Sequence, residues 1–140
     1  MLFLLFELGG KGYALDAAQI AEIVPFAQPR PVRGAPPQVA GCVAYRGDYL
    51  PVIDLAQLET GRASAQRMGT RIIVADVSWR GDRRSVAVIL ERVTEMLRCD
   101  PADFQPFAES PRGLVQRVDM DDLLAPYLSE GLFAATASAR

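Results

Sequence analysis

The chain contains no histidine among its 140 residues. Because histidine is the commonest general base, proton shuttle and metal ligand near neutral pH, its absence argues against most hydrolases and metal enzymes. Cysteine is scarce as well, since Cys42 and Cys99 are far apart and form no Cys-x-x-Cys pair. We interpret both as reduced thiols, with a disulfide or a redox switch as the alternative. The composition therefore predicts no catalytic residue, no metal site and no cofactor.

Long apolar runs are also missing. A membrane-spanning helix needs about 20 consecutive apolar residues, and the opening run Met1–Phe6 ends at Glu7. That run lacks a preceding basic segment, so we expect a first strand rather than a signal peptide. We therefore expect a cytoplasmic protein that does not insert into the membrane.

The third absence is a concentrated positive charge. The net charge is −2 and the pI is about 5.1, and the basic residues, nearly all of them arginine, are scattered. Nucleic-acid binding normally needs a clustered basic footprint, and binding to anionic membranes needs a basic amphipathic helix. The sequence therefore favours neither kind of partner.

What the chain does contain is apolar character, at 50% of its residues, which is above the usual share. Either the core is unusually dense or part of the apolar surface contacts a partner. A chain of this length buries roughly 70% of its unfolded surface and can fold without crosslinks. We expect a single domain over 1–133 with two lobes that meet at 59–69, and a disordered tail over 134–140.

Apolar runs separated by glycine turns predict short strands. We expect them at 2–8, 39–45, 49–55, 71–77, 85–90 and 114–118. Asp16 and Gln19 match a capping box, which predicts a short helix that ends at Pro25. Asp119 predicts a second short helix, which Pro126 divides. Many short strands with few helices predict a mainly β fold, either small barrels or a sandwich.

The residues that could carry chemistry have simpler explanations. Asp54 lies in an apolar strand without an acidic neighbour, so a hydrogen-bonded structural carboxylate is a better interpretation than a catalytic one. The aspartates at 119, 121 and 122 lack the glycine and the terminal glutamate of a calcium loop, and helix capping explains them. Trp79 stands alone beside a glycine turn, so we expect it to pack against the sheet rather than to stack on bases.

The most informative segment is 41–55, where two apolar runs flank a tight Arg46-Gly47-Asp48 turn. This pattern predicts a β-hairpin. Without further information Arg46 is a solvated turn residue, and the glycines supply backbone freedom. The planar guanidinium of Arg46 nevertheless suits carboxylates and carbonyls on a partner. We therefore hypothesise a rigid recognition surface rather than an active site.

An ordered set of short motifs resembles the CheW-like domain of bacterial chemosensory systems. It runs from residue 2 to about 128, as Tyr13-Ala14-Leu15-Asp16, Ile20-Ala21-Glu22-Ile23, Gly41-Cys42-Val43-Ala44-Tyr45-Arg46-Gly47, Pro51-Val52-Ile53-Asp54-Leu55, Thr70-Arg71-Ile72-Ile73-Val74, 88–96 and 118–124. Each motif alone is weak, but their order is specific. The opening residues also resemble WspB-type adaptors of surface-sensing systems.

The resemblance implies a fold and a function. The fold is two packed SH3-like five-stranded β-barrel lobes with short helices. The function is that of a noncatalytic adaptor, which couples the cytoplasmic helical tip of a chemoreceptor to the regulatory domain of a CheA-type histidine kinase, at receptor arrays near the inner membrane. Carried over by position, the receptor-binding groove between the lobes comprises Ile20, Glu22, Gly41, Arg46, Gly47, Val93 and Met96.

Three departures from the family pattern accompany the match. This chain has Ala44-Tyr45 where the family usually has Asn-Leu, and Val86-Ala87 and Glu91 stand where a glycine and an aspartate are usual. The segment 106–115 is shorter than the family's, so the second lobe is abbreviated or a stretch is missing from this sequence.

An OB-like barrel that binds single-stranded nucleic acid or a small ligand is the alternative function, and the acidic pI disfavours it. A small hydrolase is disfavoured by the absence of histidine.

Overall fold

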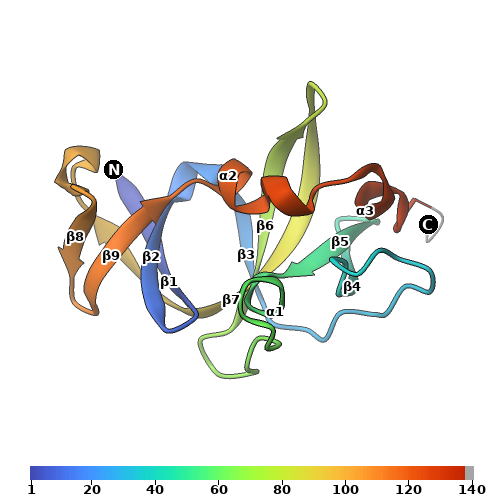
Figure 1. Ribbon diagram of the computed structural model, residues 1–140, viewed down its shortest axis with the longest axis horizontal. Coiled ribbons are helices and arrows are strands. Elements are labelled where there is room, and N and C mark those ends of the chain that lie inside the picture. Colours follow the sequence, from blue (N-terminus) through green and yellow to red (C-terminus); the bar gives the residue numbers. More distant parts are fainter. Residues whose placement is uncertain (138–140) are drawn as a thin grey trace.

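The computed structural model describes residues 1–137, over which nine strands alternate with short helical segments (Figure 1). The strands are β1 (Leu2–Leu8), β2 (Lys11–Asp16), β3 (Ile20–Pro25), β4 (Gly41–Tyr45), β5 (Asp48–Asp54), β6 (Arg71–Trp79), β7 (Asp82–Arg98), β8 (Phe107–Ser110) and β9 (Gly113–Val118). The helices are α1 (Leu55–Thr60), α2 (Met120–Leu124) and α3 (Glu130–Ala134), with 3-10 turns η1 (Ala17–Gln19), η2 (Pro101–Asp103) and η3 (Ala125–Tyr127). No helix in this described part is long and apolar enough to cross a bilayer.

Two five-stranded lobes share the long strand β7. One lobe contains β1, β2, β8, β9 and the second half of β7, and the other contains β3, β4, β5, β6 and the first half of β7. In Figure 1 the first lobe lies on the left and the other on the right, the segment from α2 to α3 runs along their upper side, and the hairpin between β6 and β7 projects above it. The predicted mainly β fold of two five-stranded SH3-like lobes with short helices is confirmed.

Strand β7 passes from one lobe to the other near Arg92. Its residues 82–90 pair with β6, and its residues 91–98 pair with β1. Arg92 has a φ of +53°, and the register of β1 against β7 shifts between Leu5 and Glu7. An extra residue with a left-handed backbone is typical of a β-bulge, which bends a strand and increases its twist. The bend lets one strand serve both lobes.

The hydrophobic core has three parts, and the largest lies between the lobes. Side chains alternate along a strand, so β1 places Leu4 and Phe6 in this central core and Phe3 and Leu5 inside the first lobe. Strands β6 and β7 divide their side chains between the central core and the interior of the other lobe. Full burial of each large apolar side chain contributes roughly 1.5–3 kcal/mol, which explains a first strand that is apolar on both faces.

The strands do not divide between the lobes at the predicted boundary of 59–69. That segment joins α1 to β6, and both flanking strands, β5 and β6, belong to the same lobe. The two lobes interleave because β2 pairs in parallel with β9, and β5 pairs in parallel with β7. Parallel partners are distant in sequence, so the local turn signals did not indicate them.

The helix predicted between Asp16 and Pro25 is wrong. The Asp16 side chain does accept a hydrogen bond from the Ala18 backbone N–H at 2.9 Å. However, η1 ends at Gln19, and the following residues form β3, which pairs antiparallel with β6. The helical spacing of the apolar residues was misleading. The intrinsic helix preference of so short a segment is weak, and backbone pairing with a neighbouring strand overrides it.

The short segment 106–115 does supply a further strand, since it contains β8 and the turn into β9. Within residues 1–137, β8 pairs with β9 alone, and β4 pairs with β5 apart from an isolated bridge between Arg30 and Cys42. Neither lobe is therefore closed by a continuous backbone ladder.

The predicted start of the disordered tail, at residue 134, is wrong. Ala134 ends α3, and Thr136 is only 6% exposed. Two preceding residues of α3, Leu132 and Phe133, are buried in the central core, which holds this end of the chain in place. The rest of the predicted tail, 138–140, lies outside the described residues.

Candidate interaction surface

The hairpin predicted over 41–55 is confirmed, with a two-residue turn between β4 and β5. Arg46 and Gly47 occupy the turn with φ values of +48° and +81°. Positive φ at both central positions matches the turn whose twist suits a β-hairpin. Glycine adopts this conformation readily, whereas arginine seldom does. The turn therefore holds Arg46 in a defined place, with 75% of its side chain exposed.

Glu22 on β3 binds this tip from the side. Its Oε1 atom accepts a hydrogen bond from Arg46 Nη2 at 3.0 Å and another from the Tyr45 hydroxyl at 3.1 Å. The Arg46 guanidinium also lies over the Tyr45 ring, 5.3 Å from its centroid. Exposed ion pairs contribute only about 0–1 kcal/mol to stability. The main effect of these contacts is to orient the guanidinium.

The phenol of Tyr45 is a stable donor in this network. Burial, and after it the hydrogen bond to the Glu22 carboxylate, raises the pKa of the Tyr45 phenol above its ordinary value. The hydroxyl therefore keeps its proton at neutral pH and continues to donate to Glu22. In the sequence, Tyr45 is only a departure from the family pattern, and that departure was the one signal that could have identified its role.

The other predicted groove residues are spread over the molecule. Ile20 begins β3 and packs against the central core, and Gly41 is buried at the opposite end of β4 from the tip. Val93 is only 6% exposed, whereas Met96 is 45% exposed on the part of β7 that pairs with β1. Only the remaining three predicted residues, Glu22, Arg46 and Gly47, form one cluster, at the hairpin tip.

Two of the aspartates that could have carried chemistry, Asp54 and Asp119, have the predicted structural roles. Asp54 caps α1 by accepting from the Gln57 backbone N–H at 3.3 Å. It also accepts from the Ser64 backbone N–H at 2.9 Å and from the Ser64 hydroxyl at 2.6 Å, so it fixes the loop after α1. Asp119 caps α2 by accepting from the Asp122 backbone N–H at 3.3 Å.

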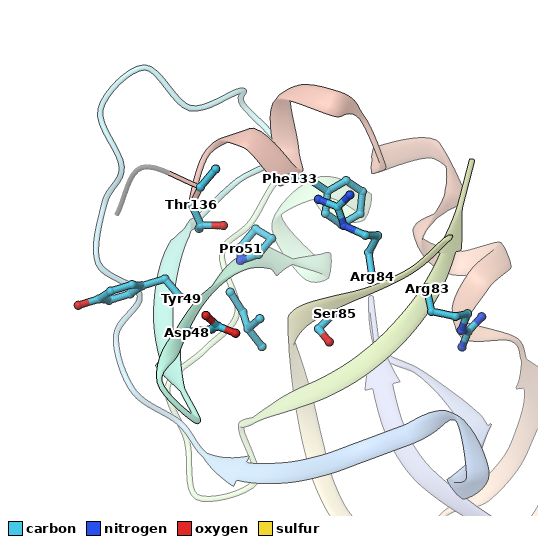
Figure 2. Close-up of a pocket in the computed structure, with 10 residues that line it drawn as sticks. Asp48, Tyr49, Pro51, Arg83, Arg84, Ser85, Phe133 and Thr136 are labelled. Atoms are coloured by element: carbon cyan, nitrogen blue, oxygen red, sulfur yellow. The ribbon is translucent and has the colours of Figure 1, made fainter. Parts of the chain in front are cut away.

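An open cavity of about 390 Å³ lies next to the tip, between the starts of β5 and β7 (Figure 2). Figure 2 shows Tyr49 and Arg83 pointing away from it, while Arg84 and Phe133 lie side by side along its border. The Ser85 hydroxyl donates to Asp76 Oδ1 at 2.7 Å and so is already engaged. The walls combine aromatic, basic and hydroxyl groups, which suits recognition of a macromolecule better than covalent chemistry.

Comparison with known proteins places this geometry in a family. The model of the CheW-like domain matches residues 2–127. The chain is 25% identical over 107 residues to the chemotaxis protein CheW of Klebsiella aerogenes, and 27% identical over 101 residues to that of Rhizobium meliloti. These alignments cover 76% and 72% of this chain, and 62% and 63% of the relatives. The chain thus spans about three-fifths of the length of the curated relatives it matches.

A solved structure has the same fold. The crystal structure of the scaffolding protein TtCheW from Thermoanaerobacter tengcongensis superposes with a TM-score of 0.73 at 19% sequence identity. The superposition covers 93% of this chain and 89% of that chain. Since the family match extends over nearly all of the described residues, the chain belongs to the CheW-like domain family.

Proposed function

We propose that the protein is a noncatalytic adaptor, which couples the cytoplasmic helical tip of a chemoreceptor to the regulatory domain of a CheA-type histidine kinase. Membership of the CheW-like domain family supports this function. Two relatives are named chemotaxis proteins, and the protein with the same fold is named a scaffolding protein. The comparisons give no support to a nucleic-acid-binding OB-like barrel.

The physical task of such an adaptor is to hold two macromolecules together. Simultaneous binding raises the effective concentration of the receptor for the kinase. A change in the receptor then alters the kinase only if the binding free energies differ between the two receptor states. We place this assembly in the cytoplasm, at receptor arrays beneath the inner membrane.

The observation that carries the proposal is the arrangement of Arg46 on Glu22. The guanidinium is 75% exposed and the Glu22 carboxylate 39% exposed, so their 3.0 Å ion pair is accessible to a partner. An exposed pair of this kind is weak, and a carboxylate on a receptor helix can share or replace Glu22 without a large cost. The tip therefore offers an oriented but exchangeable cation.

The accessible members of the predicted groove are the tip cluster and Met96. Val93 and Gly41 are buried, so we propose that they stabilise the lobes and do not contact the receptor. Ile20 is half-buried against the central core, at the start of the strand that carries Glu22.

The test is Arg46→Glu in a reconstituted mixture of receptor fragment, kinase and this protein. We expect receptor binding in a pull-down to fall at least about tenfold, because a like charge then faces Glu22 and the partner carboxylate. Arg33→Glu is the matched control, because Arg33 is exposed in the segment between β3 and β4 and lines a different hollow, beside Gly131 and Ala134.

Thermal unfolding of both variants is measured in parallel. The midpoint of Arg46→Glu should stay close to that of the parent, because the lost ion pair is exposed. Unchanged receptor coupling would refute the role of the tip, and so would a variant that no longer folds. A parent protein that binds neither receptor nor kinase would refute the adaptor function itself.

A further inference from the structure

The hairpin between β6 and β7 repeats the chemistry of the tip between β4 and β5. Its turn reads Trp79-Arg80-Gly81-Asp82, and the first tip reads Tyr45-Arg46-Gly47-Asp48. The arginine and glycine of the second turn have φ values of +51° and +81°, close to the +48° and +81° of the first. Each arginine lies over the aromatic ring that precedes it, at 4.4 Å in the second turn and 5.3 Å in the first.

The second tip carries more positive charge than its surroundings neutralise. Arg80 pairs with Glu130 at 3.7 Å, but the two side chains are 66% and 80% exposed, so this pair is weak. Arg84 lies 4.6 Å from the centroid of the Phe133 ring and 6.0 Å from that of Trp79. Among the residues that the structure describes, Arg84 has no carboxylate partner. Two guanidinium groups are thus available to a ligand.

The backbone beside this tip is open to an extended segment. Strands β5 and β7 pair in parallel only from Val52 and Ala87 to Asp54 and Ile89. Before that point they diverge, and the cavity of about 390 Å³ lies between them (Figure 2). Within the described residues, the part of β5 before Val52 pairs only with β4, and the part of β7 before Ala87 pairs only with β6. Strand edges that face a cavity in this way can accept a further strand from a partner.

We propose that the second tip and this cavity form a docking site for an extended acidic segment of a partner protein. Carboxylates of that segment bind the guanidinium groups of Arg80 and Arg84, in charge-assisted hydrogen bonds. Its backbone lies along the open strand edges, under the ring of Phe133. The site adjoins the first tip at Asp48 but uses different arginines, and the inference does not rest on the adaptor function.

The charge of the site favours an acidic protein segment over a lipid membrane or a nucleic acid as its ligand. Lipid-binding clusters usually contain about four to eight basic residues, whereas this site offers Arg84 and, in a weak exposed pair with Glu130, Arg80. Nucleic acids need a wider basic surface, and the whole chain has a net charge of −2.

The sole tryptophan of the chain gives a direct readout, because Trp79 contacts both arginines and the Phe133 ring. The full chain is titrated with a synthetic glutamate-rich peptide that lacks aromatic residues. We expect a saturable change in Trp79 fluorescence that weakens as salt increases. The midpoint should rise at least about fivefold in Arg84→Gln and in Arg80→Glu, as charge-assisted bonds are lost. Arg33→Glu should leave it unchanged.

Several outcomes would overturn the proposal. One is the absence of a saturable change up to about 1 mM peptide, which would mean that the dissociation constant is weaker than about 1 mM. Others are an equal loss of binding in Arg33→Glu, or a stronger response to an oligonucleotide or to vesicles of anionic lipid. Should Arg84→Gln unfold in a thermal melt, Arg80→Glu decides the question, because its side chain lies on an exposed turn.

Discussion

Gln19 and Asp119 are 100 positions apart in the chain, and the Gln19 side-chain amide donates to the Asp119 carboxylate at 2.6 Å. The Oε1 atom of Gln19 in turn accepts from the Met120 backbone N–H at 3.1 Å. One side chain thus joins the turn before β3 to the start of α2, whose Met120 and Leu124 are buried in the central core. This contact holds α2 over the junction of the lobes.

We predict that Gln19→Ala lowers the free energy of unfolding by about 1–2 kcal/mol, because it removes two hydrogen bonds, one of them to a charged group. A double-mutant cycle with Asp119→Ala, measured by urea unfolding, should give a coupling of about 1 kcal/mol. The control Gln116→Ala lies on an exposed position of β9 and should cost less than about 0.5 kcal/mol. A coupling near zero would show that the pair does not hold α2.

The buried Gly41 should be far more sensitive to substitution than Gly47. A Cβ atom at Gly41 would lie 2.5 Å from the Arg30 carbonyl oxygen, at a φ of +148°, whereas one at Gly47 would meet nothing within 4 Å. We expect Gly41→Ala to cost at least about 3 kcal/mol, because backbone must move, and Gly47→Ala only about 1 kcal/mol of conformational strain. Equal losses in urea unfolding would contradict the close approach of Arg30.

Two tyrosines should make the protein less stable in alkaline solution. Burial first, and then hydrogen bonds to Glu22 and Glu59, raise the pKa of Tyr45 and of Tyr127 above the ordinary value of 10.0. The folded state therefore holds these protons more tightly than the unfolded state, so the stabilisation is complete below about pH 10 and is lost as pH rises through the raised values.

The double variant Tyr45→Phe/Tyr127→Phe tests this expectation. The free energy of unfolding, measured between about pH 9 and about pH 12, should fall less steeply with pH in the variant than in the parent. Identical slopes would mean that neither phenol contributes. Tyr45→Phe alone should give an intermediate slope, because its partner Glu22 is separate from the Glu59 that binds Tyr127.

Short-range features of the fold were predictable from the sequence. The hairpin around Arg46 follows from a glycine turn between apolar runs, and the cap at Asp119 follows from an aspartate before a short apolar face. The break at Pro126 is confirmed, since α2 ends at Leu124 and η3 follows. In each case the decisive interaction joins residues a few positions apart, so the local sequence contains the information.

Long-range features were not predictable in the same way. The segment after Asp16 has helical spacing, and only its pairing with β6 makes it a strand. The candidate site shows the same limit. Glu22 lies on β3 and Arg46 follows β4, and these two strands do not pair with each other in the part of the chain that the structure describes. The family resemblance identified both residues, but the hydrogen bond from Tyr45 depends on the fold and on a residue at which the chain departs from the family pattern.

The passage of β7 through both lobes has a consequence for any attempt to dissect the protein. A cut between β6 and β7, or within β7, takes a central strand from one half, and a cut before β8 removes the parallel neighbour of β2. Each fragment would expose a long apolar edge, which favours aggregation. Fusion proteins and domain swaps therefore have to carry the two lobes as one indivisible piece.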